Sequence, residues 1–290
     1  MKSDPVTRKV TPTHWGMAGV FPGEFGLWKG DEWANHRRFV AEQGFHGGAI
    51  SPDTLIDPAR LKVLREVADS HGQVQSVHIH LDYKHTPTAN QATLTAQIAP
   101  VLTTPVPVNC VGVVVSGGGN RFDREFPITR QLEILAASLR PLVEKCRAAG
   151  LPVAIENHGD YYLSDLVTLC AMVPGLEILL DTGNCFLIGE RPDLIPDEVF
   201  PLVRATHWKD HWVRPNPEAL TFDLTGATLG EGHVGLHAIY QRLLDLHPDP
   251  ASIRMLIEWV PDPAKNPLDC FAASLSHLRK ISDCHFPNRS

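Results

Sequence analysis

Eight short apolar runs, separated by longer segments with helical periodicity, constrain the fold of this chain more than any other feature. Runs of this kind, rich in Val, Ile and Leu, are typical of parallel strands that helices cover. The expected strands are Thr13–Met17, Gly47–Ser51, Gln75–Leu81, Cys110–Ser116, Leu151–Glu156, Leu176–Asp181, Ala205–Lys209 and Met255–Trp259.

Helical patterns fill most of the segments between these strands. Three of the patterns end just before a glycine, at Gly44, Gly72 and Gly150, where a left-handed cap residue is favoured. The next strand begins within a few residues, as expected for alternating α/β units. The expected helices are Glu32–Gln43, Pro58–Ser70, Gln91–Leu102, Ile128–Ala149, Asp165–Met172, Leu236–Leu246 and Leu268–Ile281.

Four of the expected strands carry a residue type that binds metals at or near their carboxyl ends. Glu156 and Asp181 end the fifth and sixth strands, and His207 and Glu258 lie among the last three residues of the seventh and eighth. Barrel enzymes place their catalytic residues at the carboxyl ends of the strands, so we expect these side chains at one site. The alternatives are rim ion pairs for the two Glu, an Asx turn for Asp181 and a core histidine for His207.

Chain length and these four residues favour an α/β fold, a (β/α)8 TIM barrel formed by a single domain that spans residues 1–290. With 290 residues and 43% hydrophobic composition, the chain can bury a large core without division into two domains. An open doubly wound sheet would spread four ligands along its edge, whereas a barrel brings them round one mouth. No GxGxxG motif of dinucleotide-binding sheets follows the first strand.

Two Glu, one Asp and one His form a hard, oxygen-rich ligand set for one divalent metal ion. Mn²⁺ is our first expectation, and Mg²⁺, Co²⁺ or Zn²⁺ also fit, because ligand type alone discriminates weakly among these ions. The ion could polarise a carbonyl and stabilise an enediolate, while a nearby carboxylate moves a proton on the adjacent carbon.

The motifs around these residues follow one another in a fixed order. They are Ile155-Glu156-Asn157, Leu180-Asp181-Thr182-Gly183-Asn184, His207-Trp208-Lys209-Asp210, Leu229-Gly230-Glu231-Gly232-His233-Val234 and Ile257-Glu258. In this order the chain resembles the xylose isomerase-like barrel superfamily over nearly its whole length. That group includes sugar phosphate isomerases and epimerases, ketose 3-epimerases, inosose-processing enzymes and family 2 apurinic endonucleases.

The resemblance implies a role for each of the four ligand types. Glu156, Asp181, His207 and Glu258 would bind the metal, and Glu156 and Glu258 would also be the catalytic acid and base. One carboxylate can remove a proton from carbon and the other can return one, which gives epimerisation or, at a shifted position, isomerisation. The first functional expectation is therefore a metal-dependent isomerase or epimerase of a sugar or sugar phosphate.

Asn184 departs from the family pattern, because ketose 3-epimerases of this group usually carry a His three residues after the Asp ligand. A neutral amide can hold a hydroxyl but cannot carry a proton. A metal-dependent lyase or dehydratase of the same fold therefore stays open, acting on a keto-sugar or keto-cyclitol of inosose, dehydroshikimate or oxidised-glycoside type. A barrel that binds a sugar or a partner without turnover is the third hypothesis.

Five further residues near the strand ends are candidates for substrate binding, each with a structural role as the alternative. His158 shares the parity of Glu156 and could carry a proton, and His80 lies on the same strand face as His78. A guanidinium could reach a substrate hydroxyl or phosphate. The five candidates are His80, His158, Asn184, Lys209 and Arg214.

Several loops and aromatic residues have less specific expectations. The glycine run 117–120 could approach a phosphate through backbone amides or form a flexible lid, and the loop 230–233 is expected to shape the mouth. The proline segments 215–217 and 261–263 are expected in active-site loops. Trp15, Phe21 and Trp259 could form apolar walls of a pocket or belong to the core.

Composition limits the partners and the compartment. The 26 basic against 33 acidic residues argue against nucleic acid as a partner, including the DNA substrate of the endonucleases. The six cysteines show neither zinc-finger nor disulfide-framework spacing, so free thiols are expected. Since no apolar run is long enough for a membrane span or a signal peptide, we expect a cytoplasmic protein with a small-molecule sugar or polyol substrate. A homo-oligomer is one of the open options for its assembly.

Overall fold

Eight parallel strands close into a barrel in the computed structural model, which describes residues 10–18, 32–116 and 121–282. Neighbours round the barrel run in the order β1, β10, β7, β6, β5, β4, β3, β2, and β2 closes the ring on β1. The predicted (β/α)8 barrel is therefore confirmed. The strands are β1 (His14–Met17), β2 (Gly47–Ile50), β3 (Gln75–Asp82), β4 (Val108–Ser116), β5 (Val153–Glu156), β6 (Leu176–Asp181), β7 (Val203–Trp208) and β10 (Arg254–Ile257).

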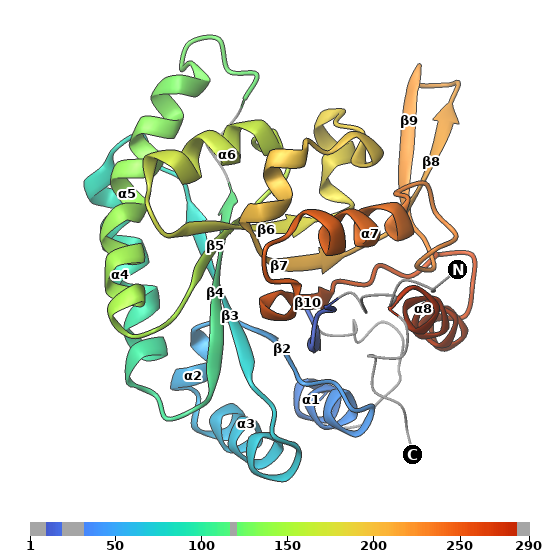
Figure 1. The fold of residues 1–290 in the computed structure, drawn as a ribbon, viewed down its shortest axis with the longest axis horizontal. Coiled ribbons are helices and arrows are strands. Elements are labelled where there is room, and N and C mark those ends of the chain that lie inside the picture. The colour runs from blue at the N-terminus through green and yellow to red at the C-terminus, as the bar shows by residue number, and fades with distance from the viewer. Residues whose placement is uncertain (1–9, 19–31, 117–120, 283–290) are drawn as a thin grey trace, which may run out of the picture.

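Helices surround these strands, as Figure 1 shows, and their ends follow the capping residues of the sequence. In α3 the Asp57 side chain accepts hydrogen bonds from two backbone N–H groups of the first turn, and Gly72 ends the helix with φ of 66°. Gly44 and Gly150 also have positive φ, as predicted. The helices are α1 (Glu32–Glu42), α2 (Asp53–Ile56), α3 (Pro58–His71), α4 (Pro87–Thr103), α5 (Ile128–Ala148), α6 (Leu163–Met172), α7 (Leu236–Leu246) and α8 (Pro267–Ile281).

Packing in the core fixes the position of each strand along the barrel axis relative to its neighbours. Its main cluster joins strand residues such as Val77 and Ile79, both fully buried, to the inner faces of the helices. A second buried cluster takes one small or apolar residue from each of the consecutive strands β4, β5, β6 and β7. The five cysteines within the described ranges are free and buried. Because packing sets the register, it also sets the level at which each strand ends at the mouth.

The segment after β7 corrects one expectation. Residues 215–217 were predicted in a loop, but β8 (His211–Asn216) and β9 (Thr221–Gly226) form an antiparallel hairpin in which Pro215 pairs with Phe222. Proline is tolerated there because the two-stranded sheet leaves its edges unpaired. Figure 1 shows the hairpin standing away from the barrel. The continuous apolar run that is typical of a buried parallel strand is therefore not expected in its sequence.

The connection between β6 and β7 contains three short 3-10 segments, at 184–188, 192–194 and 197–202. Their compact turns follow directly from the end of β6 and place residue 184 beside the barrel mouth. None of the helices in the described ranges is both long and apolar enough to cross a bilayer.

Candidate metal centre

The four predicted ligand types lie together at the mouth of the barrel. Glu156 ends β5, Asp181 ends β6, His207 lies one residue before the end of β7, and Glu258 follows β10. Asp181 and His207 are register partners, so neighbouring strands place them side by side. Each of the four residues offers a ligand atom, and these atoms all lie within 4.8 Å of one another. The expected convergence is confirmed, and we name these residues the carboxylate–histidine cluster.

Contacts within the carboxylate–histidine cluster fit a cation at its centre. Nδ1 of His207 is 3.1 Å from Oε1 of Glu156, 3.1 Å from Oε2 of Glu258 and 3.7 Å from Oδ2 of Asp181. One imidazole nitrogen carries at most one proton, so it cannot donate to three carboxylates. Oδ2 of Asp181 and Oε2 of Glu258 are buried, and both lie within ion-pair distance of Lys209 Nζ. Buried acceptors of this kind are the ligands that a divalent ion takes.

The carboxylates of the cluster raise the pKa values of His207 and Lys209. Burial alone would lower the pKa of His207, but the charge of Glu156 and hydrogen bonds with the surrounding carboxylates outweigh it and raise the pKa well above its ordinary value. Lys209 Nζ is 2.9 Å from Oδ2 of Asp181 and 2.8 Å from Oε2 of Glu258. Burial opposes its charge too, yet these two carboxylates raise the pKa of Lys209. The site therefore concentrates negative charge that needs cations.

Local turn chemistry aims Asp181 into the cluster. Its Oδ1 accepts hydrogen bonds from the backbone N–H groups of Gly183 and Asn184, at 2.8 and 2.9 Å, which leaves Oδ2 to face His207. The side chain of Asn157 bonds to both the N–H and the C=O of Asp181, at 2.7 and 2.9 Å. The Asx turn considered as an alternative to a ligand role is present, and it orients the carboxylate for that role.

Asn184 and Lys209 support the carboxylates from the side. Asn184 donates through Nδ2 to Oε1 of Glu156 at 3.2 Å, and its Oδ1 accepts from Lys209 Nζ at 3.3 Å. The hydroxyl of Thr182 in turn accepts from the Lys209 backbone N–H at 2.9 Å. A buried amide at this position fixes its neighbours without titrating.

Asp210 joins two of the sequence motifs into one structure. Its buried carboxylate accepts hydrogen bonds from the backbone N–H groups of residues 211, 230, 232 and 234, at 2.8 to 3.2 Å. A Cβ on Gly232 would collide with this carboxylate, so glycine is required there. The loop 230–233 is therefore held beside β7 by Asp210, in agreement with its expected shaping role.

Replacement of Asp210 by Ala is expected to destabilise the fold by about 3 kcal/mol or more, because several buried N–H groups lose their acceptor. Asp210→Asn keeps one acceptor oxygen and should lose less. Urea denaturation measures both changes. The matched control is Asp223→Ala, since Asp223 lies exposed on the hairpin and accepts a hydrogen bond from the side chain of Asn216. Equal stability of the Asp210→Ala and Asp223→Ala proteins would contradict this role.

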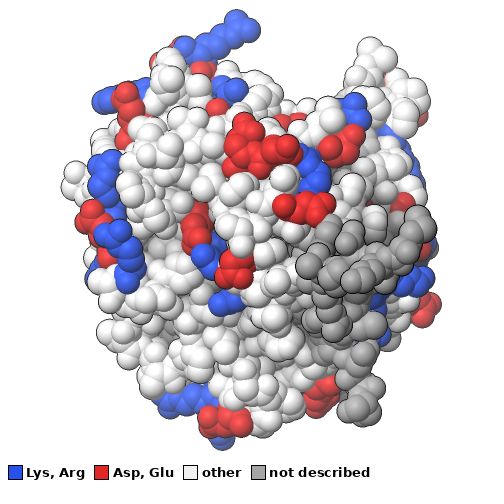
Figure 2. Space-filling model, viewed as in Figure 1, with Lys and Arg blue, Asp and Glu red and all other residues white. Residues whose placement is uncertain are grey.

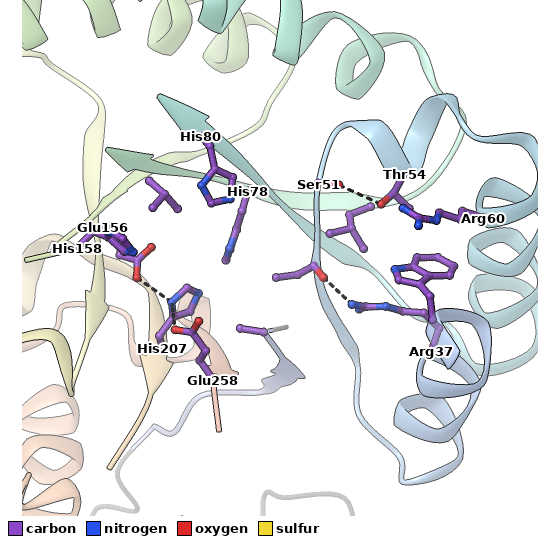
Figure 3. Close-up of a pocket in the computed structure, with 15 residues that line it drawn as sticks. Arg37, Ser51, Thr54, Arg60, His78, His80, Glu156, His158, His207 and Glu258 are labelled. Carbon is purple, nitrogen blue, oxygen red and sulfur yellow. Dashed lines mark hydrogen bonds and ion pairs between the residues drawn. The ribbon is translucent and has the colours of Figure 1, made fainter. Parts of the chain in front are cut away.

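A cavity of about 370 Å³ opens beside the cluster, a size that suits a small ligand. Figure 3 shows Glu156, His207 and Glu258 on one side of it, with His78 and His80 next to them toward its middle. The predicted substrate-binding residues His80 and His158 line this cavity, whereas Asn184, Lys209 and Arg214 do not.

His78 bridges the space between the cluster and the rest of the cavity. Its ring centroid lies 4.9 Å from that of His207, and its Nε2 is buried without a hydrogen-bond partner. Burial, reinforced by the charge of His207, holds the pKa of His78 well below its ordinary value. A neutral imidazole with an unused nitrogen can bond to a polar ligand here.

Other expectations fall elsewhere in the fold. Arg214 is exposed on β8 and lies over the Trp212 ring at 5.5 Å, so its predicted substrate contact stays a prediction. Trp15 is fully buried against Tyr240, and Trp259 packs on the core. The glycine run 117–120 and Phe21 lie outside the described residues.

The sequence reasoning missed the part of the cavity farthest from the cluster. Trp33 and Arg37 on α1, Ser51 and Thr54 after β2, and Arg60 on α3 all line it. One signal was available, because Arg37 lies three and four residues before the buried Val40 and Ala41 and so interrupts the apolar face of its helix.

Comparison with known proteins agrees with the fold. The family model described as "Xylose isomerase-like TIM barrel" matches residues 37–281. The chain belongs to this family. No curated protein sequence matches it.

Solved structures similar to this one are distant in sequence. A xylose isomerase-like TIM barrel protein from Mycobacterium smegmatis, in complex with magnesium, has 16% identity and a TM-score of 0.66, with 96% of this chain and 98% of that chain covered. The 3-keto-D-glucoside 4-epimerase of E. coli has 14% identity, a TM-score of 0.64, and 92% and 99% covered. A probable 3-DHS dehydratase of Bacillus anthracis has 16% identity, a TM-score of 0.62, and 91% and 98% covered.

Proposed function

We propose that this protein is a divalent-metal-dependent isomerase or epimerase that transfers a proton next to the carbonyl of a keto-sugar or sugar phosphate. The observation that carries the proposal is the convergence of three carboxylates and one imidazole within 4.8 Å at the barrel mouth, beside a cavity. Sugar epimerases among the solved structures share the fold and add support for the reaction class.

In this proposal Glu156, Asp181, His207 and Glu258 hold the ion. Mn²⁺ is our first choice, and Mg²⁺, Co²⁺ or Zn²⁺ would also suit the donor set. The magnesium of the Mycobacterium smegmatis protein supports a hard cation in this fold. When bound, the ion would polarise the substrate carbonyl and so acidify the neighbouring C–H.

The two glutamates differ in their surroundings, which suits an acid and a base. Glu156 is 3% exposed and is held by Asn184 and His207, whereas the side chain of Glu258 is 37% exposed and faces Lys209. Both line the cavity. One carboxylate would take a proton from the substrate carbon and the other would return one, with Lys209 and Asn184 fixing their positions.

A lyase or dehydratase is the second candidate, favoured by the histidines of the cavity. Loss of water or an aglycone requires an acid for the leaving group, and His158 lies exposed in the cavity lining near Glu156. The neutral Asn184 bonds to Glu156 and Lys209 and cannot supply that proton. The probable dehydratase of the same fold adds support.

A small-molecule substrate fits both candidates better than a nucleic acid. On the face shown in Figure 2, acidic and basic side chains are interspersed and form no continuous basic surface. A phosphate backbone would require such a surface.

Incubation in D2O with a panel of ketoses, inososes and sugar phosphates tests the function, with each candidate metal added in turn. Isomerase or epimerase chemistry should introduce solvent deuterium at carbon without loss of water, detected by mass spectrometry. A product lighter by water or an aglycone would establish the lyase instead. A protein that takes up none of the metals and exchanges no substrate proton would leave only a binding barrel.

A further inference from the structure

The cavity has a second end that differs in chemistry from the cluster. Figure 3 shows Arg37, Arg60, Ser51 and Thr54 across the cavity from Glu156, His207 and Glu258. We name the set formed by Trp33, Arg37, Ser51, Thr54 and Arg60 the arginine end. It contains two guanidinium groups and no carboxylate among the described residues that line it.

Arg37 is a buried cation with unused hydrogen-bond donors. Its residue is 1% exposed, Nη2 donates to the carbonyl of Ala49 at 2.8 Å, and Nε and Nη1 are buried without a partner. Among the described residues, no carboxylate forms an ion pair with it. A Cβ on Gly48 would collide with Nη1, so the backbone of β2 makes room for this group.

Retaining an unpaired guanidinium inside a protein is costly, and an anion from outside would offset that cost. Burial lowers the pKa of Arg37 to about 10, so the group stays charged at neutral pH. The packing of α1 on β2 accounts for the hydrogen bond from Nη2 of Arg37 to Ala49. It supplies no partner for Nε and Nη1.

The neighbours of Arg37 complete a place for an oxyanion. The Trp33 ring lies between two guanidinium groups, with Cζ of Arg37 at 5.5 Å and Cζ of Arg60 at 5.4 Å from its centroid. The hydroxyls of Ser51 and Thr54 are 3.3 Å apart at the same end. Guanidinium and hydroxyl donors are the groups that bind phosphate and carboxylate oxygens.

We propose that the arginine end is a subsite for the anionic group of the substrate, with Arg37 as its central ligand. This inference rests on the proposed function and narrows its substrate class to keto-sugars that carry a phosphate or a carboxylate away from the reacting carbonyl. The cluster would act on the carbonyl end while the arginine end holds the anion, which fixes the direction in which the substrate lies in the cavity.

Calorimetric titration of the full chain with inorganic phosphate tests the subsite, in metal-loaded and in chelator-treated protein. Arg37→Gln should weaken phosphate binding by at least about 10-fold in both forms and leave the metal content unchanged. Arg38→Gln is the matched control, because Arg38 lies one residue along on α1 and pairs with Glu66 at 2.9 Å outside the cavity. Its phosphate affinity should equal that of the wild type.

Arg60→Gln provides a second test if Arg37→Gln does not fold, since the Arg60 side chain is 43% exposed. It should also weaken phosphate binding. Equal affinity of the arginine variants and the wild type would overturn the subsite.

Three further ligands distinguish the source of the anion. D-Fructose 6-phosphate should bind more tightly than D-fructose if the substrate carries a phosphate, and D-gluconate should do so if it carries a carboxylate. No binding of phosphate or of either anionic sugar would overturn the inference. If Asp181→Ala loses the metal but still binds phosphate, the subsite inference is supported. If the wild-type protein binds phosphate but takes up no metal, only the proposed function is contradicted.

Discussion

Asp181→Ala is expected to remove the divalent ion from the purified protein, from about one ion per chain to none. Oδ2 of Asp181 is buried and lies 3.7 Å from Nδ1 of His207 and 2.9 Å from Nζ of Lys209. Removal of this oxygen leaves a metal with two carboxylates and an imidazole, beside Lys209 whose charge then competes for Glu258. Loss of a ligand from so small a set should lower affinity by several orders of magnitude.

Elemental analysis after gel filtration measures the ion, and thermal unfolding with and without added Mn²⁺ gives a second readout. The wild type should become more stable with metal, because an ion that binds only the folded state stabilises it, and the variant should not. Asp193→Ala is the control, since Asp193 lies in the same β6–β7 connection and pairs with Arg191 at the surface. An ion retained at wild-type occupancy in Asp181→Ala would refute the assigned centre.

Glu156→Gln and Glu258→Gln are each expected to reduce turnover by about 100-fold to 10,000-fold, the usual contribution of a general acid or base. Glutamine keeps the length of the side chain and one ligand oxygen but cannot accept a proton from carbon. Glu156 should be the more sensitive position for metal retention, because its side chain is 3% exposed whereas that of Glu258 is 37% exposed.

Deuterium incorporation from D2O into the substrate measures this loss independently of product analysis. Glu231→Gln is the matched control: Glu231 lies in the loop held by Asp210, pairs with Lys265 and does not line the cavity. Its turnover should equal that of the wild type. If both Glu156→Gln and Glu258→Gln retain metal and turnover, the assignment of acid and base is wrong.

The barrel could be predicted from sequence because its strands are buried on both faces and therefore consist of continuous apolar runs. The predicted third strand differs from β3 by one residue, and the predicted seventh strand begins two residues later than β7. The hairpin β8–β9 was missed because five of its twelve strand residues are exposed and Pro215 lies within it. These two strands pair with each other outside the barrel, and a local sequence pattern does not show where in the fold a segment lies.

The carboxylate–histidine cluster could also be predicted, since strand ends converge in any closed parallel barrel. The binding of a metal ion by these four residues remains a prediction, which elemental analysis of the purified protein tests. The arginine end could not be predicted, because it depends on how α1 and α3 pack on each other and α1 on β2, and its residues face the cluster only across the cavity of the closed barrel. A buried Arg37 interrupts an apolar helix face, but only the tertiary structure shows which space its nitrogens enter.

The closed strand order divides the rim of the barrel into two arcs. All four cluster residues come from the adjacent strands β5, β6, β7 and β10, whereas the arginine end and His78 belong to the first half of the chain, up to β3. If the proposed roles are correct, reaction and recognition are encoded by separate stretches of sequence that meet at the cavity. Substitutions in residues 32–82 should be able to redirect the protein to new substrates while the chemistry of residues 153–258 stays unchanged, a natural starting point for exchanging half-barrels between relatives.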